Sequence, residues 1–273
     1  MYDAKSVNSL AASVLKKASV KPSIVLMTDR IRPDVAPYIH QELIPESFRN
    51  PRFFGGGYPV KLAAFGLSKI PQDTPCVFLD LDSVVLGDLT AIARLVSPEK
   101  PCFMLNSGTT RFNALSRALH RLTAGRRFVC GNSSVIAFHT SIAPSIPDAF
   151  LQHHTAAGDV SKKYLQSDDQ FISWYLGDKI RSMPDRCAVM FRREFLSRFL
   201  WWTTFKARLP TTKSRRQEIT VVTLNGEEFK PERLLSYPDG HLIVERKGRR
   251  GAWNTETFGD LKHRILQELK ALS

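Results

Sequence analysis

Paired cysteines and long apolar runs are absent from this chain of 273 residues. Its four cysteines, Cys76, Cys102, Cys130 and Cys187, include no CxxC pair, and two of them lie in apolar, strand-like runs, so we expect reduced thiols in a cytosolic protein. No apolar run approaches the roughly 20 residues that span a bilayer. The N-terminal residues MYDAKSVNSLAASV also lack the basic and apolar regions of a signal peptide. We therefore expect neither export by a signal peptide nor an integral membrane protein.

Acidic residues are too few to balance the basic ones. The chain has 26 Asp and Glu against 39 Lys and Arg, a formal net charge of +13, which favours anionic partners such as nucleotide phosphates, nucleic acid or acidic lipid headgroups. Internal repeats and low-complexity linkers are lacking too, while the hydrophobic content of 43% is enough for a buried core. We expect a single domain over residues 1–273, with a basic and aromatic segment and a docking helix in its last part, about 192–273.

Helix-like and strand-like patterns alternate in the first hundred residues. Apolar residues recur at helical spacing from Val7 to Leu15, and SIVLMTD, 23–29, reads as a buried strand. A second helix-like segment, 58–70, precedes a strand that begins at Pro75. This alternation is typical of a mostly parallel sheet. Further along, the patterns predict a strand within 129–139, a helix over 167–178, a strand at EITVVTL, 218–224, and an amphipathic helix over about 258–272.

The stretch PCVFLDLDSVVLGDL, 75–89, places acidic residues at the end of an apolar strand. Side chains two apart on a strand point to the same side, so Asp80 and Asp82 should share one face, with Asp88 shortly after them. Two carboxylates this close either bind a hard metal ion, or act as a nucleophile and its acid, or are merely solvated at a strand end. Open α/β sheets bind ligands at the carboxyl ends of their strands, which favours a functional site.

Five segments, taken in order, carry a resemblance. FLDLDSVVLGDL is similar to the DxD segment of GT-A fold glycosyltransferases, and YPVKLAAF upstream resembles that family's helix with a basic residue facing the donor. GNSSVIAF, SDDQF and LNGEEFKP resemble the strand, the helix start and the diphosphate-closing loop that follow. The chain thus looks similar to the glycogenin-like and lipopolysaccharide galactosyltransferase-like (family 8-like) bacterial glycosyltransferases, from about Tyr2 to Pro231.

The resemblance implies a fold and an activity. The fold would be α/β, with a GT-A type mixed, mostly parallel sheet flanked by helices, and without the family's usual first strand. The activity would be metal-dependent transfer of a sugar from a nucleoside diphosphate sugar, most simply a UDP-sugar, to an acceptor hydroxyl, with retention at the anomeric carbon. The family's place in bacterial surface polysaccharide or glycolipid synthesis implies a saccharide or glycolipid acceptor.

The resemblance also implies roles for particular residues. Asp80 and Asp82 would hold Mn²⁺ or Mg²⁺, with Asn225 where the family usually has a histidine ligand, and Asp80 would reach the ribose. The remaining positions would contact the donor, namely Lys61, Asn132 and Lys230 as binding residues and Asp169 and Gln170 as catalytic residues.

Several of these positions also have an interpretation without function. Lys61 fits a solvated helix lysine, and Asn132 lies in Gly-Asn-Ser, which is typical of a turn. Asp168 or Asp169 fits a helix N-cap, worth roughly 1 kcal/mol. Two other functions compete as well: a haloacid-dehalogenase-like phosphatase, whose nucleophile motif is also a strand ending in DxD, and a non-enzymatic nucleic-acid-binding protein, suggested by the charge.

The segment 192–216 is rich in Arg and Lys and interleaves five large aromatic residues. Basic residues with Trp and Phe suit contact with an anionic membrane, and Trp201 and Trp202 would then sit at the headgroups while Arg198 and Arg208 attract the lipids. In the rival interpretation the aromatic side chains are buried in the core. The first interpretation predicts a cytoplasmic protein with peripheral contact at the inner face of the membrane.

Overall fold

The computed structural model describes residues 3–55, 58–106, 118–119, 121–123, 131–142, 145–157 and 166–272. The chain forms two compact units that are both discontinuous in sequence. The first unit comprises 1–21, 80–90 and 184–273, and the second comprises 22–79 and 91–183. Because the chain passes repeatedly between them, neither unit is a separable segment, and the single domain over 1–273 stays a prediction.

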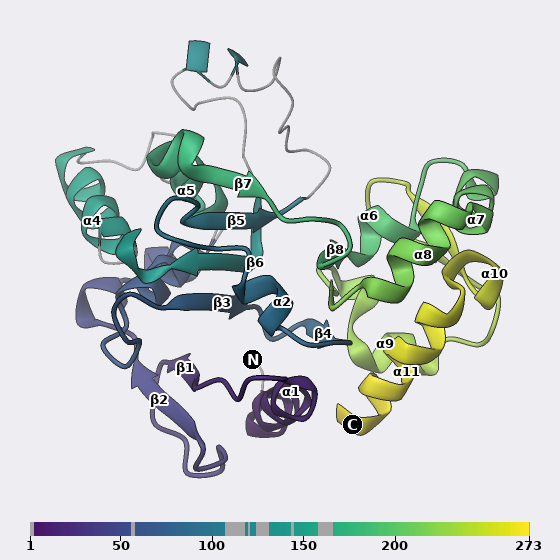
Figure 1. Ribbon diagram of the computed structural model, residues 1–273, viewed down its shortest axis with the longest axis horizontal. Coiled ribbons are helices and arrows are strands. Elements are labelled where there is room, and N and C mark those ends of the chain that lie inside the picture. Colours follow the sequence, from purple (N-terminus) through teal and green to yellow (C-terminus); the bar gives the residue numbers. More distant parts are fainter. Residues whose placement is uncertain are drawn as a thin grey trace. The chain divides into compact units, whose positions relative to one another are not determined.

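The second unit is built on a four-stranded sheet (Figure 1). Its strand order is β3-β6-β5-β7, and a separate pair, β1-β2, is parallel. The elements of this unit are β1 (Ile24–Thr28), β2 (Ile39–Leu43), η1 (Glu46–Phe48), η2 (Pro51–Phe54), η3 (Pro59–Gly66), β3 (Pro75–Leu79), β5 (Cys102–Leu105), β6 (Asn132–His139), η4 (Thr140–Ile142), α4 (Ser145–Ala157), α5 (Asp168–Leu176), η6 (Gly177–Lys179) and β7 (Ile180–Ser182). The short helix α2 (Thr90–Ala93) begins at the boundary between the units.

The sheet is mixed, as expected, but it is not mostly parallel. Strand β6 lies between β3 and β5 and runs antiparallel to both, with Phe138 opposite Cys76 on one side and Cys102 on the other. Among the described strands of this sheet, β5 and β7 form the one parallel pair. The expectation failed because alternation of helices and strands along the chain does not fix the direction of a strand that is inserted between two earlier neighbours. The predicted lack of the family's first strand stays a prediction.

The core of the second unit is rich in aromatic side chains. Phe150 lies at its centre, with ring centroids 5.8 Å from Phe48, 5.3 Å from Phe53 and 5.1 Å from Phe171. These rings come from η1, η2, α4 and α5, so their contacts join the helices to one another. Helix α5 also packs on η3 and on β6. The start of α5 is thereby held in a fixed position beside the start of β6.

The first unit contains a three-stranded sheet, β4-β9-β8, and a hairpin, β10-β11. Strand β9 is antiparallel to β4 and parallel to β8. The elements of this unit are α1 (Ala4–Lys17), β4 (Ser83–Val85), β8 (Ala188–Met190), α6 (Phe191–Phe195), α7 (Leu200–Arg208), α8 (Pro210–Glu218), β9 (Val221–Thr223), η7 (Glu227–Phe229), α9 (Pro231–Ser236), β10 (His241–Val244), β11 (Arg250–Trp253), α10 (Thr255–Phe258) and α11 (Asp260–Leu272).

Most elements predicted from the sequence are present. Helices α1, α5 and α11 and strands β1, β3, β6 and β9 occupy the expected segments, although β9 is limited to Val221–Thr223. The segment expected as a helix over 58–70 is a 3₁₀ helix, Pro59–Gly66. Helix α11 buries Leu261, Ile265 and Leu269, as its apolar face predicted. Among the described residues, no helix is long and apolar enough to cross a membrane.

Part of the basic segment 192–216 surrounds one buried acid, Glu194, which is 5% exposed. Arg216 Nε lies 2.7 Å from Glu194 Oε1, and Arg215 Nη2 donates to both carboxylate oxygens at 2.8 Å. Lys206 Nζ donates to the Glu194 carbonyl at 2.7 Å. Burial works to raise the pKa of Glu194, but the charges of Lys206, Arg216 and Arg215 outweigh it and lower the pKa. These basic residues therefore point inward and join α6, α7 and α8.

Replacing Glu194 by Ala should destabilise the protein by about 3–5 kcal/mol, because the change leaves the buried Arg216 guanidinium without its carboxylate. Urea denaturation would measure the free energy of unfolding. The control is Asp178→Ala, since Asp178 pairs with Arg121 at 2.7 Å on the surface, where removing an ion pair costs about 0–1 kcal/mol. Equal losses in the two variants would contradict a structural role for the Glu194 network.

Candidate functional site

Asp80 and Asp82 lie in the turn between β3 and β4. Strand β3 ends at Leu79, and the Ser83 amide donates to the Asp80 carbonyl at 3.1 Å to close the turn. Strand β4 then begins at Ser83, opposite Thr223 of β9. The acids therefore follow the strand instead of belonging to it, and strand alternation does not set the directions of their side chains. Their predicted place at the carboxyl end of a sheet strand is confirmed.

Two other parts of the first unit meet at this turn, the segment after β9 and the start of α9. The Leu224 amide donates to the Asp82 carbonyl at 2.8 Å, so Asn225 follows directly on the residue opposite Asp82. The Asn225 side-chain oxygen accepts a hydrogen bond from Thr223 Oγ1 at 2.6 Å, which orients its amide. Lys230 Nζ, at the start of α9, lies 3.7 Å from Asp82 Oδ2. We call Asp80, Asp82, Asn225 and Lys230 the carboxylate–lysine cluster.

A second group of polar residues lies where α5 begins beside β6, in the second unit. Ser133 Oγ donates to Asp168 Oδ2 at 2.6 Å, and the Ser133 amide donates to Asp169 Oδ1 at 2.5 Å. Asn132 Nδ2 donates to Asp169 Oδ2 at 3.3 Å. Lys61 Nζ, from η3, lies 3.9 Å from Asp168 Oδ2. We call these five residues the aspartate-pair cluster.

The two aspartates of this cluster retain protons to unusually high pH. Burial, joined by repulsion from Asp169, raises the pKa of Asp168 to about 7, against the opposing charge of Lys61. Burial raises the pKa of Asp169 too, and the hydrogen bonds from Ser133 and the charge of Lys61 only partly offset it. Two carboxyl groups this close titrate as a pair, and a pKa of about 7 leaves Asp168 partly protonated near neutral pH. Such a site can donate as well as accept hydrogen bonds.

Gln170 follows the aspartate pair on the first turn of α5. Its backbone amide donates to Ser167 Oγ at 3.2 Å, so Ser167, the first residue of the predicted helix, is the N-cap of α5, and Asp168 and Asp169 are not. The side-chain oxygen of Gln170 is buried and accepts no hydrogen bond from the residues that the structure describes. A buried polar atom is normally hydrogen-bonded, so this oxygen marks a position suited to a donor group of a ligand.

Two further features do not belong to either cluster. Asp88 Oδ1 accepts a hydrogen bond from the Thr90 amide at 2.9 Å, so Asp88 stabilises the start of α2. Hydrogen bonds from Ser19 and Thr90 outweigh the effect of its burial and lower the pKa of Asp88 to about 2.

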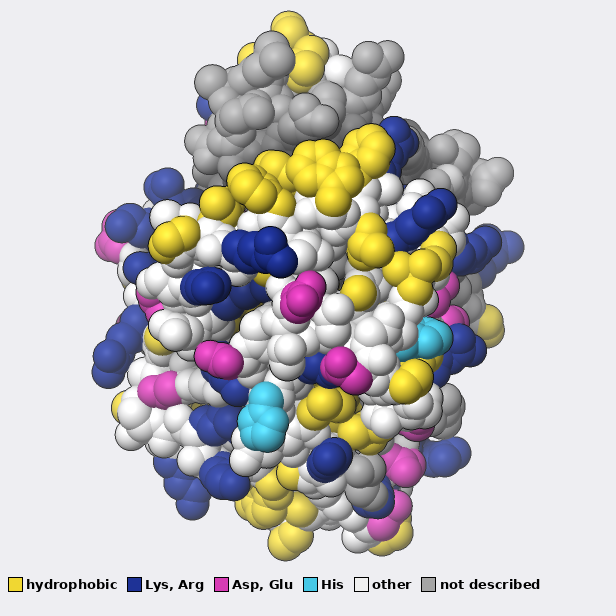
Figure 2. Space-filling view, turned by 90° about the vertical axis from the view of Figure 1, so that its right-hand side faces the viewer, with side chains coloured by type: hydrophobic (Ala, Val, Ile, Leu, Met, Phe, Trp, Pro, Cys, Tyr) yellow, Lys and Arg dark blue, Asp and Glu magenta, His cyan; other side chains and the backbone are white. Residues whose placement is uncertain are grey.

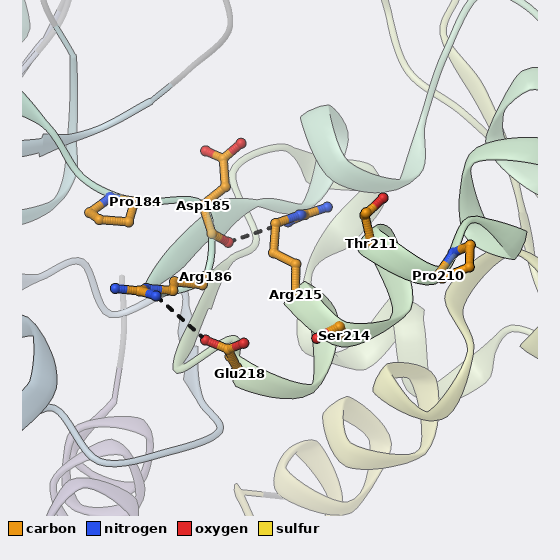
Figure 3. A pocket seen from close by; sticks show the side chains of 8 residues that line it. All are labelled: Pro184, Asp185, Arg186, Pro210, Thr211, Ser214, Arg215 and Glu218. Atoms are coloured by element: carbon orange, nitrogen blue, oxygen red, sulfur yellow. Dashed lines mark hydrogen bonds and ion pairs between the residues drawn. The ribbon is translucent and has the colours of Figure 1, made fainter.

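An open pocket of about 650 Å³ in the first unit contains no residue of either cluster (Figure 3). Its charged side chains pair with protein groups, as Asp185 does with Arg193 at 2.8 Å and Arg186 with Glu218 at 4.0 Å.

The structure thus brings the predicted residues into two groups. Around one turn lie Asp80, Asp82, Asn225 and Lys230. At the start of α5 lie Lys61, Asn132, Asp169 and Gln170. Sequence reasoning missed Ser133 and treated Asp168 as a helix cap. The signal was present, because Ser133 follows Asn132 and Asp168 precedes Asp169. Cys130 lies outside the described residues. Within the described ranges, no three His, Cys, Asp or Glu residues gather as a metal site.

No protein-family model and no curated protein sequence matches the chain. Solved structures do: LgtC as an active-site mutant superposes with a TM-score of 0.56 at 12% identity, over 98% of this chain and 92% of that one. The chain shares the GT-A fold. The galactosyltransferase LgtC in complex with donor and acceptor sugar analogues superposes with a TM-score of 0.55 at 13% identity, over 99% of this chain and 92% of that one.

A larger protein contains a similar fold as one part. The bifunctional glycosyltransferase WbbM in its apo form superposes with a TM-score of 0.55 at 14% identity, over 97% of this chain. The chain spans 47% of that protein. The predicted resemblance to the fold of family 8-like glycosyltransferases is thereby confirmed.

Proposed function

We propose that this protein is a metal-dependent glycosyltransferase that moves a sugar from a nucleoside diphosphate sugar, most simply a UDP-sugar, to an acceptor hydroxyl. The observation that supports this most is the carboxylate–lysine cluster at a strand end of a chain with the GT-A fold. The fold gives no such support to a phosphatase or a nucleic-acid-binding protein. As for the bacterial members of the resembling family, the acceptor would be a surface saccharide or a glycolipid.

The carboxylate–lysine cluster suits a divalent cation and a diphosphate. Asp80, Asp82 and Asn225 supply carboxylate and amide oxygens, the donors that Mg²⁺ and Mn²⁺ prefer. A bound cation would supply positive charge for the leaving diphosphate. Lys230 Nζ, 3.7 Å from Asp82, is farther than the roughly 2.8 Å of a tight charge-assisted hydrogen bond. Lys230 can therefore contact a phosphate oxygen without losing a strong bond to Asp82.

The aspartate-pair cluster suits the sugar. Asp169 is oriented by Ser133 and Asn132, so its carboxylate is held in one position, and Gln170 offers a buried amide oxygen beside it. Carboxylate and amide oxygens accept hydrogen bonds from sugar hydroxyls, and a carboxylate also stabilises positive charge at an anomeric carbon. One LgtC structure has a glutamine-to-glutamate change in its active site. The family resemblance implies retention at the anomeric carbon.

Thermal unfolding with a panel of sugar nucleotides would test this function. A ligand that binds only the folded state raises the melting temperature, by an amount that grows with the ratio of its concentration to its Kd. We expect at least one nucleoside diphosphate sugar to raise it when Mn²⁺ is present and to do so much less with a chelator. Sugar phosphates without a nucleoside serve as the control. No shift with any sugar nucleotide would contradict the proposal.

A further inference from the structure

Aromatic side chains form a continuous exposed surface at α7. Phe199 is 62% exposed, Trp201 65%, Trp202 43% and Phe205 50%. Their ring centroids are 6.4 Å apart for Phe199 and Trp201, 5.7 Å for the two tryptophans and 5.5 Å for Trp202 and Phe205. The opposite face of α7 is buried through Thr203 and Ala207. The interpretation that these tryptophans lie in the core is therefore wrong. Figure 2 shows hydrophobic side chains gathered in a band beside Lys and Arg.

The hairpin β10-β11 extends this surface. Ser197, just before α7, exchanges backbone hydrogen bonds with Arg250 of β11 at 2.7 and 3.0 Å. Gly251 follows, and a Cβ atom there would collide with the Phe195 carbonyl, so the close approach of β11 requires glycine. Leu242 and Val244 of β10 are 45% and 48% exposed, while Ile243 between them is buried. The hairpin is thus fixed beside the start of α7 and adds aliphatic side chains to the exposed surface.

The charges around this surface are almost all positive. Residues 195–217 contain no acidic residue. The basic side chains of this segment that do not pair with Glu194 are exposed. Four acids lie on or beside these elements. Glu245 is buried, and Glu256 is exposed on α10, a helix packed on α7. Glu218, at the end of α8, pairs with Arg186 at 4.0 Å, and Asp239, before β10, pairs with Lys262. The exposed basic residues of α7, α8, the hairpin and the segment just before α7 are Arg198, Arg208, Lys213, Arg246, Lys247 and Arg250.

We propose that α7 and the β10-β11 hairpin form a docking face for the surface of an anionic lipid bilayer. Tryptophan and phenylalanine bind at the level of the lipid headgroups, and exposed Lys and Arg attract anionic lipids. Contact of the aliphatic Leu242 and Val244 with lipid would contribute favourable binding free energy. Aliphatic side chains do not stack on nucleic-acid bases as aromatic ones do, so nucleic acid would not use them in this way. A second copy of the same face would bring like charges together, which opposes self-association. This proposal does not depend on the proposed function.

Co-sedimentation with vesicles would test the docking face. The intact chain is mixed at low salt with sucrose-loaded vesicles of phosphatidylcholine alone, or of equal parts phosphatidylcholine and phosphatidylglycerol. We expect the protein to pellet with the anionic vesicles only, and to return to the supernatant at high salt, because salt screens the attraction. Protein that stays in the supernatant with anionic vesicles at low salt would overturn the proposal.

Two variants separate the contributions of charge and aromatic contact. Arg246→Glu with Lys247→Glu should lower the partition coefficient at least about 25-fold, since each basic residue contributes roughly fivefold. Trp201→Ser with Trp202→Ser should weaken binding while leaving the melting temperature nearly unchanged, because both side chains are exposed. The matched control is Lys16→Glu with Lys21→Glu, which changes the charge equally at exposed positions outside this face.

The outcomes are decisive in either direction. Weaker binding in both test variants and normal binding in the control would support a localised face. Equal loss in the control would show attraction by net charge alone and overturn the proposal. A tryptophan-dependent dimer in sedimentation velocity, or tryptophan-dependent binding of single-stranded DNA, with no vesicle binding, would assign the face to another partner and also overturn it.

Discussion

Replacing Asp82 by Ala is expected to abolish the dependence of UDP binding on Mn²⁺. The change removes a carboxylate ligand of the proposed cation site. Removing a residue that only supports a metal ligand lowers metal affinity roughly 10–100-fold, so removing the ligand itself should lower the affinity for Mn²⁺ further. Lys230 lies 3.7 Å from this carboxylate and would remain, so weak UDP binding through its charge should persist with or without the cation. Isothermal titration calorimetry with and without Mn²⁺ would measure both.

A matched control for this prediction is Glu256→Ala, which removes an exposed carboxylate from the same unit. We expect its Mn²⁺-dependent binding to equal that of the unaltered protein. If Asp82→Ala kept its full Mn²⁺ dependence, Asp82 would not be a metal ligand. Loss of binding in both variants would show that the calorimetry responds to net charge and not to the cluster.

Asp168→Asn should make the protein more stable at alkaline pH. The pKa of Asp168 is raised from its ordinary 3.8 to about 7, so the folded state binds this proton more tightly than the unfolded state does. The resulting contribution to the free energy of unfolding is complete below pH 3.8 and is lost as the pH rises through 7. Asparagine imitates the neutral carboxyl group and removes this pH dependence.

Urea denaturation at pH 5 and pH 8 would test the prediction. The stability of Asp168→Asn relative to the original chain should be on the order of 2–3 kcal/mol greater at pH 8 than at pH 5. The control, Asp178→Asn, replaces a surface carboxylate and should show nearly the same relative stability at both pH values. An unchanged relative stability of Asp168→Asn would mean that the aspartate pair does not hold a proton near neutral pH.

The sequence predicted elements better than it predicted pairing. Apolar periodicity was sufficient to predict helices α1 and α11, since each helix buries one face. It was not sufficient for the direction of β6, because an apolar run such as SVIAF suits either a parallel or an antiparallel neighbour. The same limit applied to Trp201 and Trp202. Helical spacing shows which aromatic residues share a face, but whether that face is covered depends on elements distant in sequence.

The candidate site was predictable only in its parts. Asp80 and Asp82 followed from an apolar strand that ends in acids, whereas Asn225 and Lys230 followed from the resemblance alone. That Lys230 lies near Asp82 depends on the pairing of β4 with β9, which connects residues far apart in the chain. Ser133 was missed because a serine in Gly-Asn-Ser is typical of a turn, and only the packing of α5 on β6 brings it to Asp168.

The Glu194 network restricts how this sequence can change over time. Loss of Glu194 alone leaves the buried Arg216 without its carboxylate partner, and loss of Arg216 alone leaves the buried carboxylate with fewer partners. A wholly apolar replacement of such a network can be as stable as the original, yet each single step toward it costs stability. Glu194, Arg215 and Arg216 should therefore be inherited together, and their joint presence would mark related chains even where overall identity has fallen too low to align.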